Sequence, residues 1–82
     1  MKAVVYSKVN CPYCEKIKVL LYHGAIEYTE YVYGRDFTKE QFYAEFGEGS
    51  TFPQVILDDK HIGGCTDTAK YLKEQNLIWH TQ

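Results

Sequence analysis

Two cysteines, Cys11 and Cys14, stand three residues apart where an apolar run gives way to a helix-like stretch. The run ends at Ser7 and the helical periodicity begins at Pro12, so the pair is expected in the first turn of a helix. Unpaired backbone N–H groups and the positive end of the helix dipole stabilise a thiolate there. Together they bring a cysteine pKa from about 8.5 into the range of about 3.5–7.5. The pattern therefore predicts a reactive thiol.

The spacing also allows the two thiols to form a disulfide with each other, which favours redox chemistry. We expect Cys11 to attack and Cys14, on the inward side of the helix, to resolve. A structural zinc site would need four ligands, yet no second pair of closely spaced cysteines or histidines accompanies this one. A static disulfide is disfavoured because so short a loop removes little entropy from the unfolded chain. We therefore expect no metal. The other candidate ligands are scattered along the chain: Cys65, His23, His61 and His80. We interpret the three histidines as structural or solvated.

Length and charge restrict the class of protein further. The 82 residues suffice for one compact domain, taken as residues 1–82, and we expect a monomer. Three cysteines without an apolar leader favour a reducing, cytoplasmic location over secretion. The net charge of −2, with both signs interspersed, favours neither nucleic acid nor an anionic membrane as a partner. No apolar stretch is long enough to span a bilayer.

The first half of the chain predicts a strand, a helix and a second strand. The first strand covers Lys2–Ser7, and the helix covers Pro12–His23. Gly24 should end the helix as a left-handed C-cap. Alternating residues from Ile26 predict a strand that runs to about Tyr33. The apolar stripe of the helix consists of Cys14, Ile17, Leu20 and Leu21.

The second half predicts a helix, a hairpin and a final helix. The first of these helices runs from about Thr38 to Phe46, with Thr38 as N-cap and Gln41 completing a capping box. The hairpin joins a strand at Gln54–Leu57 to one that begins at His61. Gly63 and Gly64 end that strand. The final helix covers about Thr66–Gln75 and should bury Ala69, Leu72 and Tyr71.

The resulting element order is βαβ followed by αββα. Because a crossover between parallel strands is right-handed, the first two strands should be parallel, and the hairpin should add antiparallel strands. We therefore expect an α/β fold, with a four-stranded mixed sheet flanked by three helices.

Three segments resemble the signatures of glutaredoxins, which have a thioredoxin-like fold. They are the Cys-Pro-Tyr-Cys run at 11–14, Thr51–Pro53 before a strand, and the Gly-Gly-Cys-Thr-Asp run at 63–67. The match in order and spacing covers nearly the whole chain and is similar to the minimal dithiol type of bacteria and phages. Two residues depart from the family pattern: Phe52 replaces the usual valine, and Thr66 replaces a frequent aspartate. The first should matter little if only the backbone of residue 52 is used.

The resemblance implies a glutathione site in a groove beside Cys11. It implies a cis turn over Thr51–Pro53, although only about 5–6% of X–Pro bonds are cis in folded proteins. The backbone of Phe52 would then pair with glutathione as an added strand. The N–H groups of Cys65 and Thr66 would hold the γ-glutamyl carboxylate, and Asp67 would accept from its ammonium group. Supporting and flanking positions are Pro12, Gly63 and Gly64, with Lys8 near the thiolate or the glycine carboxylate and Tyr13 as a wall of the groove.

Each of these assignments has a structural alternative. Lys8 would otherwise be a solvated loop lysine, and Asp67 an ordinary acid at a helix N-terminus. For Cys65 we favour a buried small hydrophobe over a catalytic role. The contact of the glycine carboxylate stays open among Lys8, Arg35, Lys39 and Gln41.

The sequence thus predicts a glutathione-dependent thiol–disulfide oxidoreductase that reduces protein disulfides and glutathione mixed disulfides. Glutathione is the reducing co-substrate, no cofactor is bound, and ribonucleotide reductase is a substrate that the resemblance suggests. One alternative is a redoxin of similar shape that thioredoxin reductase reduces. Another is an iron–sulfur carrier, in which Cys11 and glutathione would ligate a cluster across a dimer, and Pro12 argues against it.

Overall fold

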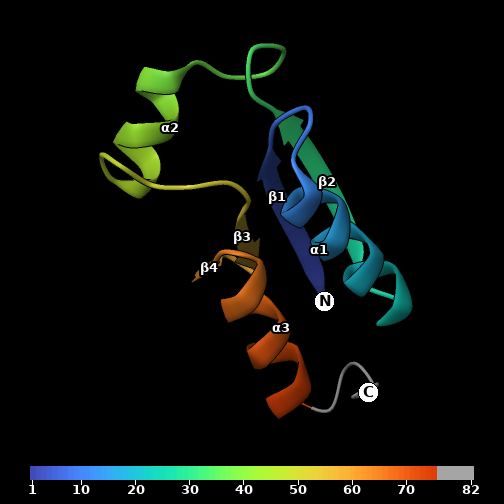
Figure 1. The fold of residues 1–82 in the computed structure, drawn as a ribbon. Coiled ribbons are helices and arrows are strands. Elements are labelled where there is room, and N and C mark those ends of the chain that lie inside the picture. Colours follow the sequence, from blue (N-terminus) through green and yellow to red (C-terminus); the bar gives the residue numbers. More distant parts are fainter. Residues whose placement is uncertain (76–82) are drawn as a thin grey trace.

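A computed structural model describes residues 1–75, and His80 lies outside this range. The chain folds in the predicted order of strands and helices (Figure 1). The elements are β1 (Lys2–Ser7), α1 (Pro12–His23), β2 (Glu27–Val32), α2 (Lys39–Phe46), β3 (Gln54–Leu57), β4 (Lys60–Gly63) and α3 (Cys65–Glu74).

The four strands form one mixed sheet in the order β2-β1-β3-β4. β1 runs parallel to β2, with Lys2 opposite Glu27, and antiparallel to β3, with Tyr6 opposite Gln54. β3 and β4 form the predicted antiparallel hairpin. This topology confirms the expected α/β, thioredoxin-like fold of four strands and three helices.

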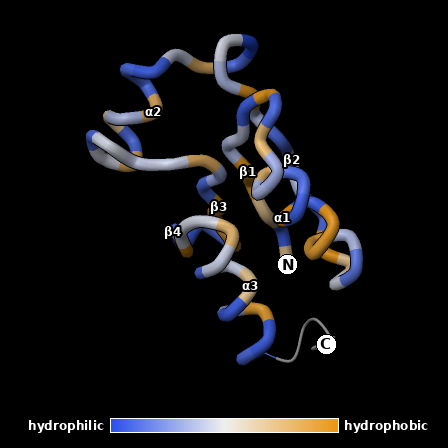
Figure 2. The backbone as a smooth tube through the Cα atoms, viewed as in Figure 1, coloured by the Kyte–Doolittle hydropathy of each residue, from blue (hydrophilic) through white to orange (hydrophobic). Residues whose placement is uncertain are grey.

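One face of the sheet carries the main hydrophobic core, between the sheet and helices α1 and α3. Alternate residues of β1 point to this face, and Val5 is fully buried there. Ile17 and Leu21 of α1 and Leu72 of α3 complete the centre of the cluster. Hydrophobic and hydrophilic stretches alternate along α1 and α3, as expected for helices that bury one side (Figure 2).

The opposite face carries an aromatic cluster that holds α2. Tyr6 lies next to Val5 in β1, so its side chain points to the other face. Its ring lies 5.2 Å from that of Phe37 and 4.9 Å from that of Phe46, and α2 also contributes the buried Phe42. Because α2 packs through these rings, it stands apart from α1 and α3 in Figure 1.

The end of α1 differs from the prediction. Gly24 has φ −83° and is not left-handed, whereas Ala25 adopts φ +56°. The N–H of Ile26 then donates to the carbonyl of Leu21 at 2.9 Å, which closes the helix end one residue later than expected. The left-handed position therefore falls on an alanine, and a glycine precedes it.

Helix α3 also differs in detail, because it begins at Cys65 and buries Thr68 instead of Ala69. Ala69 and Tyr71 are half-buried, and Leu72 is fully buried as predicted. Within residues 1–75, no helix combines the length and apolarity that a transmembrane span requires.

Candidate active site

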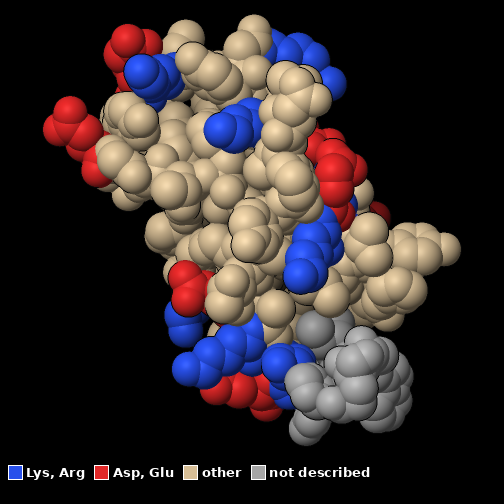
Figure 3. Space-filling model, in the orientation of Figure 1, with Lys and Arg blue, Asp and Glu red and all other residues tan. Residues whose placement is uncertain are grey.

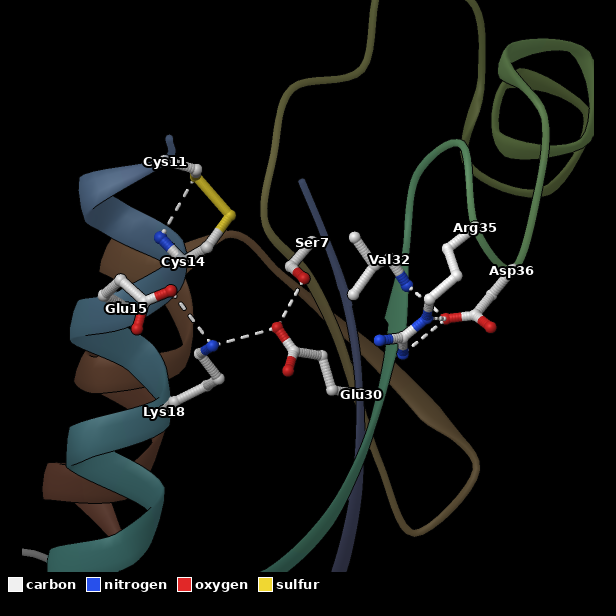
Figure 4. Close-up of polar contacts among 9 residues, drawn as sticks. All are labelled: Ser7, Cys11, Cys14, Glu15, Lys18, Glu30, Val32, Arg35 and Asp36. Carbon is white, nitrogen blue, oxygen red and sulfur yellow. Dashed lines mark hydrogen bonds and ion pairs between the residues drawn. A yellow bond between two sulfur atoms is a disulfide. The ribbon is translucent and has the colours of Figure 1, made fainter. Parts of the chain in front are cut away.

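Cys11 is the N-cap of α1, and its sulfur lies within the first turn of the helix. The residue is extended, and its Sγ accepts a hydrogen bond from the backbone N–H of Cys14 at 3.2 Å. Pro12 occupies the first helical turn, where its missing N–H costs nothing. A disulfide joins Cys11 and Cys14, whose Cα atoms are 5.2 Å apart (Figure 4). When this bond is reduced, the same N–H and the helix dipole stabilise a thiolate on Cys11.

The two sulfurs differ in their access to solvent. Cys14 is 0% exposed and Cys11 is 7% exposed, so only Cys11 keeps some contact with solvent. Cys11 nevertheless lines a surface hollow together with Asn10, Pro12 and Glu15, and Cys14 is not part of the lining of this hollow. An incoming disulfide can therefore reach Cys11, whereas the buried Cys14 can reach only Cys11.

Three loops meet at one end of the sheet, and strand register brings them together. Since Tyr6 of β1 pairs with Gln54 of β3, the loop that leads from β1 to Cys11 lies beside Pro53. β4 reaches the same end, because Val55 pairs with Gly63. An added Cβ at Gly64 would lie 3.4 Å from the carbonyl oxygen of Pro53, so the start of α3 closely approaches this segment.

The segment Thr51–Pro53 contains the predicted cis bond between Phe52 and Pro53. The side chain of Phe52 also has a packing role that the sequence did not indicate, because its ring stacks on that of Phe42 with centroids 4.2 Å apart. It also lies 6.0 Å from the ring of Tyr33. Phe52 therefore anchors the segment to α2 through the aromatic cluster.

The first turn of α3 presents free hydrogen-bonding groups. Its N-cap is Gly64, which has no side chain to bond the first N–H groups, and these belong to Cys65 and Thr66. The side chain of Asp67 lies over Gly63, where a Cβ would come within 2.6 Å of Oδ2. Gly63 also has φ +131°, so both space and conformation require glycine there. Asp67 has no hydrogen-bond or ion-pair partner among residues 1–75.

Lys8 and Lys39 share a hollow with Thr51 and Phe52. The Nζ atom of Lys8 lies 5.5 Å from the centre of the Phe52 ring. Lys8 does not line the hollow beside Cys11, so its position fits a contact to a ligand's carboxylate better than direct support of the thiolate.

The other two candidates for the glycine carboxylate are held elsewhere. Gln41 receives the N–H of Thr38 at 2.8 Å in the predicted capping box. The guanidinium of Arg35 forms an ion pair with Asp36 at 2.8 Å (Figure 4). This hydrogen-bonded contact raises the pKa of Arg35 and lowers the pKa of Asp36. The structure thus brings Lys8 and Lys39 to the site and does not bring Gln41 or Arg35 there.

Two further candidates have contrasting environments. Tyr13 is 60% exposed and lines neither the hollow beside Cys11 nor that beside Thr51. Cys65 is buried in the main core, as predicted, and burial raises the pKa of its thiol.

His61 contacts Gln54 at 2.8 Å, consistent with a structural role. No group of three or more potential metal ligands occurs within residues 1–75.

A polar network that was not predicted from the sequence joins α1 to the sheet. Lys18 of α1 contacts both Glu15 and Glu30 at 3.0 Å, and the buried Ser7 donates to Glu30 at 2.6 Å (Figure 4). Burial opposes the ionisation of Glu30, but the hydrogen bonds from Ser7 and Lys18 outweigh it and lower the pKa of the carboxyl group. The position of Glu30 in the alternating pattern of β2 could have indicated this network, because that position faces α1.

Known proteins share this sequence and fold. The family model "Glutaredoxin" matches residues 3–62. Glutaredoxin 1 of Rickettsia prowazekii (strain Madrid E) is 37% identical over 76 residues, which cover 90% of this chain and 80% of that protein. The crystal structure of glutaredoxin 1 from Francisella tularensis in complex with cacodylate has a TM-score of 0.75 at 31% identity and covers 93% of this chain and 95% of that one. A buckwheat glutaredoxin–glutathione complex has a TM-score of 0.69 at 27% identity, with 92% and 71% covered.

The fold and the helix-capping cysteine pair define a thiol–disulfide oxidoreductase of the thioredoxin-like class. Within that class, the matched family model and the similar relatives show that the chain belongs to the glutaredoxin family.

Proposed function

We propose that this protein uses glutathione to reduce protein disulfides and glutathione mixed disulfides. The observation that carries the proposal is the convergence of three groups around Cys11. These are the strand edge at Thr51–Pro53, the free N–H groups at the start of α3, and the unpartnered carboxylate of Asp67. Glutathione has an extended cysteinyl backbone, a carboxylate and an ammonium group that match these three features.

The reaction begins when the Cys11 thiolate attacks one sulfur of a substrate disulfide. A bond forms between that sulfur and Cys11, and the substrate's other sulfur leaves as a thiolate. Cys14 then loses its proton to solvent and attacks Cys11, which releases the reduced substrate and leaves the disulfide seen in Figure 4. Two glutathione molecules supply the two electrons that reopen this disulfide, and they leave joined as glutathione disulfide.

Mixed disulfides of glutathione need only the first thiol. Cys11 attacks the glutathionyl sulfur and releases the protein thiol. The thiolate of a second glutathione then attacks the glutathionyl sulfur bound to Cys11, which releases the Cys11 thiolate and forms glutathione disulfide. We further propose a reducing, cytoplasmic setting, a monomeric state, and disulfide-containing proteins such as ribonucleotide reductase as substrates. These proposals are supported by the family resemblance.

A coupled assay tests the choice of electron donor. The enzyme and a small disulfide are mixed either with glutathione, glutathione reductase and NADPH, or with thioredoxin reductase and NADPH, and the loss of NADPH is followed by absorbance. We expect rapid turnover in the first mixture and slow turnover in the second. Robust turnover with thioredoxin reductase and none with glutathione would overturn the proposal in favour of a redoxin reduced by thioredoxin reductase.

A further inference from the structure

A hollow beside the active site is larger than a carboxylate contact requires. It lies between Lys8, the segment Gly49–Phe52 and α2, and its volume is about 480 Å³. Binding pockets for drug-sized ligands measure about 300–1,000 Å³, and the single carboxylate of a glycine would fill a small part of such a space. The hollow therefore has room for a side chain as well.

The lining of the hollow is aromatic and basic. Tyr33, Phe42, Tyr43 and Phe52 contribute rings, Lys8 and Lys39 contribute positive charge, and no acidic residue belongs to the lining. Within residues 1–75, neither lysine makes an ion pair. Figure 3 shows basic side chains set in uncharged surface between α2 and the loop before α1, with acidic side chains at the margins of this face. Such a lining complements an aromatic ring accompanied by a negative charge.

The hollow is continuous with the edge on which a substrate would lie. Thr51 and Phe52 line the hollow and also form the segment proposed to pair with an extended peptide. An extended chain advances about 3.3–3.4 Å per residue, so two residues beyond the reacting cysteine span roughly 7 Å. If the γ-glutamyl end of glutathione lies at α3, the opposite, C-terminal direction leads to Lys8 and this hollow.

We propose that the hollow is a subsite that selects protein disulfides by sequence. It takes an aromatic side chain, with an acidic neighbour, from the two residues that follow the reactive half-cystine of the substrate. The two lysines of the lining complement the acidic residue by charge, and the four rings complement the aromatic side chain. The inference rests on the proposed function for the direction of the bound peptide.

Symmetric disulfides of three short peptides test the subsite. The acetylated and amidated sequences are Ala-Cys-Phe-Asp, Ala-Cys-Phe-Lys and Ala-Cys-Ala-Asp. Each is mixed with stoichiometric enzyme that dithiothreitol has reduced and from which the dithiothreitol has been removed, and a single turnover is followed by rapid quenching and chromatography. We expect the first peptide to react about tenfold faster than the third and about fivefold faster than the second, since an exposed ion pair contributes little.

Charge reversal identifies the hollow as the source of the preference. Lys39→Glu should abolish or invert the preference for the acidic over the basic peptide, and Tyr43→Ser should reduce the preference for the aromatic peptide. Lys60→Glu is the matched control, because Lys60 lies at the other end of β3 from Thr51 and should leave both ratios unchanged.

Equal rates for the three peptides with the unmodified enzyme would overturn the subsite, and this comparison needs no variant to fold. A preference for the basic or the small peptide, or ratios that Lys39→Glu and Lys60→Glu change alike, would overturn it as well. The single turnover uses no glutathione. Failure of glutathione as the electron donor would therefore appear only in the coupled assay, and the two failures are distinguishable.

Discussion

Replacement of Asp67 by asparagine should weaken glutathione binding without unfolding the protein. The change keeps the shape of a side chain that packs over Gly63 and removes the charge offered to the γ-glutamyl ammonium. A hydrogen bond to a charged group contributes about 1.5–3 kcal/mol, and each 1.4 kcal/mol is a factor of ten. Because Asp67 is exposed, the lower end applies, and we expect affinity to fall about tenfold.

The stability cost of Asp67→Asn should be small. The carboxylate has no partner within residues 1–75, so the variant loses only a favourable charge in the first turn of α3, worth about 0.3–1 kcal/mol. Binding is measured by calorimetric titration with S-methylglutathione, which cannot react, and stability by thermal unfolding. Asp59→Asn removes the same charge from the exposed β3–β4 turn and should leave the affinity unchanged. An unchanged affinity in Asp67→Asn would refute the placement of glutathione across the start of α3.

Three further predictions test the thiol roles, the aromatic cluster and the polar network. Cys11→Ser should abolish turnover of every disulfide, whereas Cys14→Ser should keep turnover of glutathione mixed disulfides in the coupled assay. If both variants lost this turnover equally, the assignment of Cys11 as attacking and Cys14 as resolving cysteine would be wrong. Phe42→Leu should lower the free energy of unfolding in urea by about 1–2 kcal/mol, because the ring is buried against its aromatic neighbours. The exposed Tyr22→Leu should change it by less than about 0.5 kcal/mol, and equal effects would contradict the packing argument. The lowered pKa of Glu30 stabilises the folded protein at pH values above the ordinary value of 4.5, and this stability is lost as the pH falls through the pKa of the folded state. The free energy of unfolding should therefore decrease less between about pH 6 and pH 3 for Glu30→Gln than for the unmodified protein. Equal decreases in the two proteins would contradict this linkage.

Local signals made much of the fold predictable. The capping box at Thr38 and Gln41 depends on residues three apart, and both of its hydrogen bonds form. The position of the cysteine pair at the start of α1 was likewise predictable, because the apolar run ends at Ser7 and the helical pattern begins at Pro12. These features could be predicted because the interacting groups are close in the sequence and the geometry of one helical turn fixes their contacts.

The unpredicted features depend on contacts between distant residues. The helix from Thr38 to Phe46 was predicted, but no signal close in the sequence indicated that Phe52 would stack on Phe42. The pairing of Lys18 with Glu30 depends in the same way on how α1 crosses β2. Where several residues satisfied the same chemical requirement, as for the glycine carboxylate, only the fold separated Lys8 and Lys39 from the others.

The central claim is that glutathione reaches Cys11 and forms a mixed disulfide with it, and mass spectrometry of a trapped enzyme tests this most directly. Cys14→Ser is incubated with glutathione disulfide, and the protein is then digested without reductant. We predict one glutathionyl group per chain, carried by the peptide that contains Cys11, and none on the buried Cys65. An enzyme that stays unmodified, or one modified only at Cys65, would contradict the account.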